Sequence, residues 1–293
     1  MSNIPYLHFN KDKKSLVKAY MLALIPLLLF GFYKNGILLY QNEFISFSDL
    51  FIPLYFYFIS ALVGFLVALI RKDAKTEYVL YGLILGCSIS INTNMLIYPL
   101  VLFTVLFITS VIARKYAFNF LALTRIFLII ALLFNSYSYL NVSEKIEAFN
   151  YNLFDIFWGY GSGGIGSTSL FFLLISFLIL SFNKFYKKEI AISASSSFLA
   201  LFLAFFLATR DISYLEKALN GSVYFAFLFV ASDLYVSPNT KRGMLIYGAL
   251  IGILSAILTL FVPIYEAGYI SILLVSFFIP MINQILAKKY LHS

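Results

Sequence analysis

The fold is decided by an apolar stretch near the start of the chain, Ser15-Leu-Val-Lys-Ala-Tyr-Met-Leu-Ala-Leu-Ile-Pro-Leu-Leu-Leu-Phe-Gly-Phe-Tyr33. A helix needs about 20 mostly apolar residues to cross a bilayer core of about 30 Å, and this stretch has that length. It lacks the small-residue cleavage site of a secretory signal peptide, so we expect it to remain in the mature protein as a membrane-spanning helix.

Similar apolar runs recur along the rest of the chain. They lie at 50–70, 78–90, 95–113, 119–138, 168–183, 190–208, 218–232, 243–262 and 267–287. Hydrophobic residues make up 62% of the 293 residues and charged residues 12%, whereas a soluble domain has about half and about a quarter. The runs are continuous rather than alternating, which argues against a transmembrane barrel. The sequence therefore predicts an all-α polytopic membrane protein with about ten transmembrane helices.

Lysines and arginines predict the orientation of these helices, because cytoplasmic loops carry an excess of both. Most of the 21 fall in the two tails and in every second connection: Lys11, Lys13, Lys14, Lys18, Arg71, Lys72, Lys75, Arg114, Lys115, Lys184, Lys187, Lys188, Lys241, Arg242, Lys288 and Lys289. The other connections hold Lys34, Lys145, Arg210 and Lys217. We therefore expect both termini in the cytoplasm and the chain in the cytoplasmic (inner) membrane. The net charge of +8 then belongs to membrane loops, not to a nucleic-acid-binding surface.

The longest connection divides the runs into two equal sets. The predicted organisation is a cytoplasmic tail (1–14), a first five-helix repeat (15–138), an outer loop (139–167), a second five-helix repeat (168–287) and a cytoplasmic tail (288–293). An odd number of spans in each half inverts the second repeat relative to the first. The third runs, 78–90 and 218–232, are short and lead into polar residues, a pattern that indicates a midplane site in inverted-repeat transporters. Two merely short spans are the alternative.

The residue inventory excludes several kinds of chemistry. Cys87 is the only cysteine, and the two histidines, His8 and His292, lie in the tails. We therefore expect no disulfide framework and no metal or haem site held by histidines inside the bundle. No nucleophile–base pair is visible in the spans, so we assign no catalytic residue. The serines at 193, 195, 196 and 197 indicate close helix packing.

Two charged residues in the apolar runs are candidates for ligand binding. Arg125 lies within the run 119–138, too deep to reach the interface easily, so it should face the bundle interior or a wet cavity. Its partner could be Asp233, a phosphate or a polar ligand; snorkelling to the interface is the alternative. Asp233 precedes the basic turn Ser237-Pro-Asn-Thr-Lys-Arg-Gly243, where it could line a cavity or simply pair with Lys241 or Arg242.

A glycine-rich segment, Trp158-Gly-Tyr-Gly-Ser-Gly-Gly-Ile-Gly-Ser-Thr-Ser169, opens the second half. Its glycines would let the backbone approach a ligand closely. Ser167, Thr168 or Ser169 can cap the following helix, whose N–H groups attract an anion or an oxygen acceptor. The segment lacks the lysine of a nucleotide-binding P-loop. A tight re-entrant turn that only packs against its neighbours is the alternative.

Several stretches resemble one family, the D subunit of the Rnf electron-transport complex and the B subunit of sodium-translocating NADH:quinone reductase. The resemblance is carried by Ala23-Leu-Ile-Pro-Leu-Leu28, Tyr81-Gly-Leu-Ile-Leu-Gly86, Phe118-Asn-Phe-Leu-Ala-Leu123, Leu153–Gly159 with Gly164-Ile-Gly-Ser-Thr-Ser169, and Phe229-Val-Ala-Ser-Asp-Leu-Tyr-Val-Ser-Pro-Asn-Thr-Lys-Arg-Gly243. It covers essentially the whole chain. It implies ten spans in two inverted halves, as the charges indicate independently.

One departure from the family bears on function. Family members in redox complexes carry FMN on a threonine of the outer loop, but the corresponding stretch here, Asn135–Asn150, contains no threonine. The resemblance therefore implies that no flavin is covalently bound. Some chains that resemble the D subunit but lack this threonine act as riboflavin transporters. A scaffold that cradles an isoalloxazine could bind free riboflavin between aromatic rings.

The sequence thus favours a secondary or facilitated riboflavin transporter rather than an enzyme, embedded in the lipid bilayer as a monomer or a homo-oligomer. We expect the substrate to contact Asn119, Arg125, Gly163, Gly164, Gly166, Ser167, Thr168, Asn220 and Asp233. The alternative is a membrane subunit of an ion-translocating electron-transport complex with non-covalent flavin. A passive channel for a small polar solute is a third possibility.

Overall fold

The computed structural model describes residues 5–115, 118–132, 139, 152–233, 236–238 and 240–291, whose regular structure is helical. The first half contains α1 (Pro5–Phe32), a π-helical turn η1 (Tyr33–Ile37), α2 (Leu38–Gln41), η2 (Asp49–Phe51), α3 (Ile52–Arg71), α4 (Lys75–Ser88), α5 (Ile97–Lys115) and α6 (Phe120–Leu132). The second half contains α8 (Leu153–Trp158), α9 (Leu170–Ser181), α10 (Lys188–Thr209), α11 (Ser213–Leu219), α12 (Gly221–Phe229), α13 (Lys241–Leu258), α14 (Ile264–Ser276) and α15 (Ile279–Leu291).

The architecture is that of a polytopic membrane protein. Among the described residues, four helices are long and apolar enough to cross a bilayer: Lys13–Gln41, Asp49–Arg71, Lys188–Thr209 and Lys241–Leu258. If the bent pair α14–α15 counts as one span, the number of candidate spans in the described residues rises to five. Shorter apolar helices are Ile97–Ile112, Phe120–Leu132 and Leu170–Ser181. The all-helical fold class is confirmed, while the number of crossings stays a prediction.

The first helix is longer than the apolar run indicates. It continues past Tyr33 through η1 to Gln41, so that the span covers 29 residues. Lys34, expected in an outer loop, is instead inside this helix and fully buried. The helix continues because backbone and hydroxyl oxygens of another segment solvate the ammonium group, as described below.

The last run also differs from its prediction. The sequence predicts one continuous span over 267–287, but α14 and α15 meet at 51°. The break follows Ser276, where the N–H groups of Phe277 and Phe278 bond to carbonyls only three residues back. Such tightened last turns end a helix, and Pro280 in the first turn of α15 has no N–H to continue the ladder.

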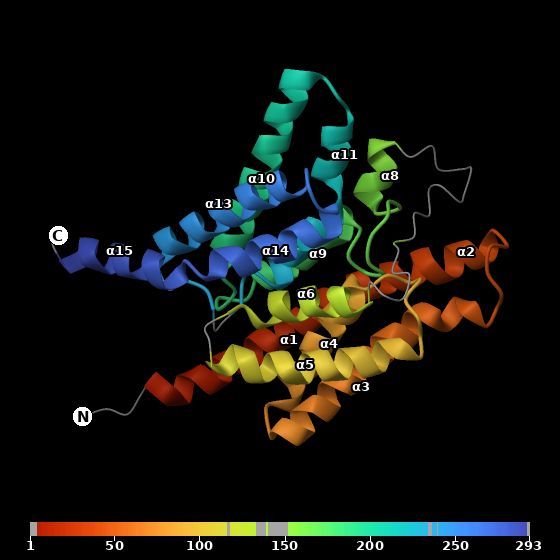
Figure 1. The fold of residues 1–293 in the computed structure, drawn as a ribbon, viewed down its shortest axis with the longest axis horizontal. Helices are drawn as coiled ribbons and strands as arrows, with labels where there is room; N and C mark the ends of the chain where they lie inside the picture. Colours follow the sequence, from red (N-terminus) through yellow and green to blue (C-terminus); the bar gives the residue numbers. More distant parts are fainter. Residues whose placement is uncertain are drawn as a thin grey trace.

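The two halves repeat the same set of helix contacts. In the first half α3 contacts α4 and α5, α5 contacts α6, and α4 contacts α1 and α6; in the second half α10 contacts α12 and α13, α13 contacts α14, and α12 contacts α9 and α14. The halves meet where α1 packs on α9 and α6 packs on α14. Figure 1 shows α3 and α5 on one side of the molecule, α10 and α13 on the other, and α1, α6, α9 and α14 between them.

Two helix pairs approach at backbone distance. On α3 and α4, a Cβ at Gly64 would lie 2.1 Å from the Tyr78 carbonyl oxygen, and one at Gly82 would lie 2.1 Å from that of Ser60. On α13, a Cβ at Gly252 would lie 2.0 Å from the Ser197 hydroxyl of α10. Small residues of this kind let helices associate in lipid. The close packing expected from the α10 serines is therefore confirmed at Ser197.

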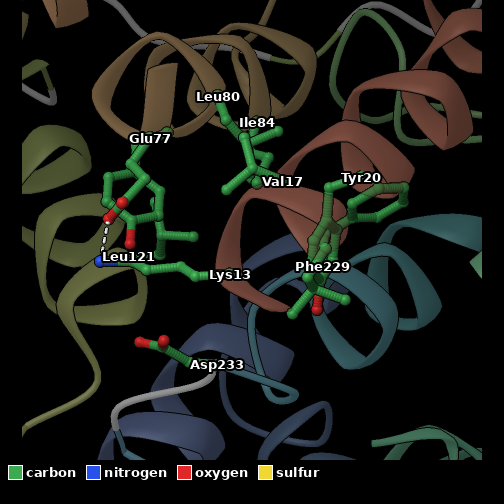
Figure 2. Close-up of a pocket in the computed structure, with 11 residues that line it drawn as sticks. Lys13, Val17, Tyr20, Glu77, Leu80, Ile84, Leu121, Phe229 and Asp233 are labelled. Carbon is green, nitrogen blue, oxygen red and sulfur yellow. Dashed lines mark ion pairs between the residues drawn. The ribbon is translucent and has the colours of Figure 1, made fainter. Parts of the chain in front are cut away.

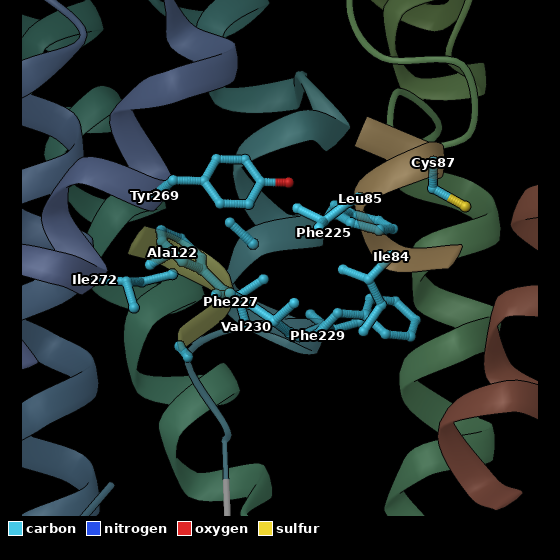
Figure 3. Close-up of a cluster of buried hydrophobic side chains, with 14 of the residues drawn as sticks. Ile84, Leu85, Cys87, Ala122, Phe225, Phe227, Phe229, Val230, Tyr269 and Ile272 are labelled. Atoms are coloured by element: carbon cyan, nitrogen blue, oxygen red, sulfur yellow. The ribbon is translucent and has the colours of Figure 1, made fainter. Parts of the chain in front are cut away.

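Two short helices meet in the centre of the bundle. α4 has 14 residues and α12 has 9, so they reach about 21 Å and about 14 Å, and neither crosses a core of about 30 Å alone. Their side chains join those of α6 and α14 in the apolar cluster of Figure 3, which includes Ile84, Ala122, Phe225, Phe229 and Ile272, each at most 2% exposed. The predicted short third runs are thus found in both halves.

Candidate functional site

The glycine-rich segment lies between the facing ends of α4 and α12. The Gly166 and Ile165 N–H groups donate to the carbonyls of Cys87 and Ile89 at 2.8 Å, just where α4 ends. The Gly221 N–H, at the start of α12, donates to the Thr168 carbonyl at 3.1 Å. The segment thus satisfies backbone groups that two broken helices would leave unpaired in the membrane.

Two glycines of this segment, Gly163 and Gly164, lie too close to their neighbours to carry a side chain. A Cβ at Gly164 would lie 2.5 Å from the Ser88 carbonyl oxygen, and one at Gly163 would lie 2.6 Å from the Ser222 hydroxyl. At Gly166 the nearest atom, the Leu27 carbonyl oxygen, would be 3.2 Å away. These contacts match the alternative of a tight turn that packs against its neighbours; close approach of a ligand to the same glycines stays a prediction.

The three hydroxyl residues that follow have distinct positions. Ser169 caps α9 by accepting the Phe172 N–H at 3.3 Å, as expected for one of the three. The Thr168 hydroxyl donates to the Gly159 carbonyl at 2.7 Å and so closes the loop on itself. Ser167 is buried, 2% exposed, and its hydroxyl lies beside Gly164.

A lysine that the sequence analysis placed in a loop holds this segment to α1. The Lys34 Nζ donates to the Gly161 carbonyl at 2.7 Å and to the Thr168 hydroxyl at 3.0 Å. The next residue, Asn35, donates its amide to the Ile165 carbonyl at 3.1 Å. Both lie in the π-helical turn η1, a type of turn that frequently marks functional sites. The signal in the sequence is Lys-Asn-Gly inside an apolar run that resumes at Ile37.

Arg125 is fully buried and faces the bundle interior, as predicted. Its Nη2 donates to the Glu266 Oε1 of α14 at 2.9 Å, to the Tyr139 hydroxyl at 2.6 Å and to the Ser88 carbonyl at the end of α4 at 3.0 Å. The Tyr139 hydroxyl also donates to Glu266 Oε1. The guanidinium lies 5.5 Å from the centre of the Tyr269 ring.

Glu266 is therefore the carboxylate that pairs with Arg125. The sequence points to Asp233 as one possible partner and not to Glu266. Glu266 is 8% exposed and lies in the first turn of α14, just before the last apolar run. The signal is a single acidic residue within Val262-Pro-Ile-Tyr-Glu-Ala-Gly268, where a charge is costly unless it is paired.

The two asparagines expected to contact the substrate cap helices. Asn119 accepts the Ala122 N–H at 2.9 Å and donates to the Val230 carbonyl at 2.8 Å, which ties α6 to the end of α12. Asn220 caps α12 by accepting the Ser222 N–H at 3.0 Å, and its amide lies 3.5 Å from the Ser162 carbonyl. Asn220 borders the glycine-rich segment, whereas Asn119 lies at the opposite end of α12. Contact of either one with a substrate stays a prediction.

Asp233 lines a different cavity. It faces a pocket of about 40 Å³ between α1, α4 and the end of α12, together with Lys13, Tyr20, Glu77 and Phe229. Lys13 and Glu77 form a 2.8 Å ion pair at its edge, and Figure 2 shows Asp233 below Lys13. Arg125 and Asn220 thus lie near the glycine-rich segment, which itself contains the predicted residues from Gly163 to Thr168. Asp233 lies apart from them.

Comparisons with known proteins agree with the resemblance. The model of the NQR2, RnfD, RnfE family matches residues 1–292. The B subunit of the Na(+)-translocating NADH-quinone reductase of Chlamydia pneumoniae is 28% identical over 151 residues, covering 46% of this chain and 30% of that protein. The corresponding protein of Chlamydia caviae is 27% identical over 171 residues, covering 53% and 34%.

A third relative, the same reductase's B subunit in Chromohalobacter salexigens, is 27% identical over 143 residues, covering 46% of this chain and 34% of that protein. Each match therefore spans a minor part of the curated relative's length. The family match, in contrast, extends over residues 1–292. Together with the helical fold and its apolar spans, it shows that this multi-pass membrane protein belongs to the NQR2, RnfD, RnfE family.

Proposed function

We propose that the chain is a membrane subunit of an ion-translocating electron-transport complex. The observation that carries this proposal is the family match over residues 1–292, since the relatives are named as subunits of a Na⁺-translocating NADH-quinone reductase. The sequence alone favours riboflavin transport, with this function as the alternative, and the relatives support the alternative better.

The geometry of the bundle supports a role in ion movement. Arg125 and Glu266 form a charged pair buried between the two halves. Ionisable residues inside a membrane bundle are costly and mark ion pathways and proton relays. Arg125 and Glu266 lie beside the C-terminal end of α4, a helix too short to span the membrane. Broken helices of this kind provide midplane sites in ion-coupled transporters.

The proposed complex would hold any flavin on this chain without a covalent bond. The stretch Asn135–Asn150 has no threonine to esterify. Apart from Tyr139, this stretch lies outside the residues that the structure describes.

Riboflavin transport is the second candidate, and the missing threonine favours it. Two cavities of the structure do not support it in this conformation. The pocket at Asp233 has about 40 Å³, whereas pockets for small organic ligands have about 300–1,000 Å³. A groove of about 450 Å³ between α1 and α9 is lined by apolar side chains and Tyr33, and it offers little to the uracil-like edge of a flavin.

We propose for this subunit a topology of two inverted five-helix halves. The repeated helix contacts support two inverted five-helix halves, 15–138 and 168–287. The first turn of α1 and the last turn of α15 lie at the same end of the molecule in Figure 1, which agrees with an even number of crossings. The positive charges of the tails and of every second connection support the proposal that both termini lie in the cytoplasm and that the membrane is the inner one.

The test is affinity purification of the tagged chain from membranes of its own organism in a mild detergent. We expect redox subunits to co-purify, and we expect inverted vesicles to lose most NADH-driven ion uptake when the gene is deleted. Return of the wild-type gene should restore uptake, and Arg125→Ala should not. A chain that purifies alone, together with loss of riboflavin uptake in the deletion strain, would decide for the second candidate.

A further inference from the structure

One nitrogen of Arg125 sits inside a small cage of oxygen atoms. The Ser88 carbonyl, the Tyr139 hydroxyl and the Glu266 Oε1 lie 3.0, 2.6 and 2.9 Å from the same Nη2. Arg125 is 0% exposed and Glu266 is 8% exposed, so bulk water does not compete for these contacts. The cage joins both halves, with ligands from the end of α4, from Tyr139 and from α14.

The cage suits a spherical cation better than a planar guanidinium. An Nη atom carries two hydrogens, which cannot point along three separate directions at once. The carbonyl of Ser88 is the last of α4, where the helix dipole adds negative potential. The second carboxylate oxygen of Glu266, Oε2, has no hydrogen-bond partner among the described residues and could complete the shell.

The charge of the cage selects the class of cation. It contains one carboxylate and otherwise neutral oxygens. Divalent cations favour oxygen sites with several anionic ligands. One negative charge balances one positive charge, and Arg125 supplies that charge in this structure. Carbonyls at the ends of broken helices are also the groups that coordinate Na⁺ in ion-coupled transporters.

We propose that Ser88, Tyr139 and Glu266 form a binding site for a small alkali cation, and that Arg125 is a tethered cation that occupies this site in the present conformation. The transported ion and the guanidinium exclude one another. When the ion enters, the guanidinium leaves Glu266; the face of the Tyr269 ring, 5.5 Å away, offers it a second resting place. This inference rests on the proposed function and names the site at which the ion binds.

Exchange between the two cations provides a coupling device. Glu266 remains paired in either state, and the displaced guanidinium retains the face of the Tyr269 ring as its contact. Arg125 belongs to α6 and Glu266 to α14, so release of the pair frees one half from the other. Ion binding would thereby permit movement between the halves.

The test measures cation-dependent stability of the purified chain in lipid nanodiscs. Unfolding is followed while NaCl replaces choline chloride at constant ionic strength. Arg125→Met empties the cage, so we expect its unfolding midpoint to rise with the logarithm of Na⁺ concentration, as for a ligand that binds only the folded state. Its apparent affinity for Na⁺ should exceed that of the wild type at least about tenfold.

Matched variants separate this site from general salt effects. Arg71→Met removes another largely buried arginine, whose Nη2 lies 3.5 Å from the Ser110 carbonyl, and should show no specific response to Na⁺. Glu266→Gln in the Arg125→Met background removes the anionic ligand and should abolish the response. If Arg125→Met does not fold, Arg125→Lys is used, since its shorter side chain reaches the cage less well.

The outcomes are distinct. Specific rescue of Arg125→Met or Arg125→Lys by Na⁺, lost with Glu266→Gln, supports the site. The proposal is overturned if both variants respond equally to Na⁺ and choline, or if only pH changes their stability. Na⁺ rescue in a chain that has no partner subunits in its native membrane would leave the site intact and reject the proposed complex. Co-purified partner subunits without Na⁺ rescue would support the proposed complex and reject the cation site.

Discussion

Arg125 and Glu266 lie 141 residues apart in the chain, yet their side chains meet at 2.9 Å between Nη2 and Oε1. Arg125 belongs to the last described helix of the first half and Glu266 to the equivalent helix of the second half. The pair is therefore a direct polar link between the halves, buried where α6 packs on α14.

Removal of either member of this pair should be costly, because it leaves the other charge buried without compensation. We expect Arg125→Ala and Glu266→Ala each to lower the free energy of unfolding by about 3–5 kcal/mol. The double substitution Arg125→Met/Glu266→Leu should cost less than the sum of the two single changes. Thermal unfolding can be followed by reaction of a fluorogenic thiol dye with Cys87, the single cysteine, which is 0% exposed in the folded chain. Additive losses in the double variant would show that the two side chains are not coupled.

The contact between the glycine-rich segment and α12 should not tolerate a methyl group. A Cβ at Gly221 would lie 2.3 Å from the Thr168 carbonyl oxygen, so Gly221→Ala should destabilise the protein by about 1–3 kcal/mol. The matched control is Gly161→Ala, since a Cβ there would meet no atom within 4 Å. The thiol-dye assay should show a lower unfolding temperature for Gly221→Ala alone. Equal effects of the two substitutions would contradict the described packing.

Lys34 should control the order of the glycine-rich segment more than the global stability. Lys34→Met removes the two hydrogen bonds to Gly161 and Thr168, but it also removes the cost of burying an ammonium group. We therefore expect a small change in unfolding temperature and faster amide hydrogen exchange in 159–168. Hydrogen-exchange mass spectrometry compares this variant with Lys184→Met, an exposed lysine. Unchanged exchange in the segment would show that Lys34 does not hold it.

Any flavin bound by this chain should be lost on denaturation. The absence of a threonine in Asn135–Asn150 removes the attachment residue implied by the resemblance. We expect the acid-precipitated protein to be colourless and its band on a denaturing gel to show no flavin fluorescence. Intact-mass measurement provides the control, since it should equal the mass of the polypeptide. A flavin adduct in the denatured chain would mean that another residue serves as the attachment point.

Much of the fold follows from the sequence, because membrane thickness sets the length of each apolar run. Differences arise where a polar group finds its partner far away in the chain. Lys34 interrupts the first apolar run, so hydropathy alone predicts that the helix ends there. The helix continues because the Gly161 carbonyl and the Thr168 hydroxyl accept hydrogen bonds from the Lys34 ammonium group. Likewise, continuous hydrophobicity over 267–287 conceals the bend between α14 and α15.

The candidate site was predictable only in part. The cost of a buried charge identified Arg125, and the structure confirms its burial. Its partner was not predictable, because Glu266 becomes its neighbour only when α6 packs on α14. Asn119 and Asn220 are polar residues near apolar runs, which suggests substrate contacts. In the structure both accept backbone N–H groups at the start of a helix, and asparagine is a preferred residue at that position.

The most direct measurement of the central claim is purification of the tagged chain from its native membranes, with quantitative mass spectrometry of the proteins that accompany it and an assay of NADH-driven ion uptake in vesicles. Membership of an ion-translocating electron-transport complex predicts redox subunits in fixed ratio to the chain and uptake that disappears with the gene. A chain recovered without redox subunits, from vesicles whose ion uptake does not depend on it, would contradict the claim.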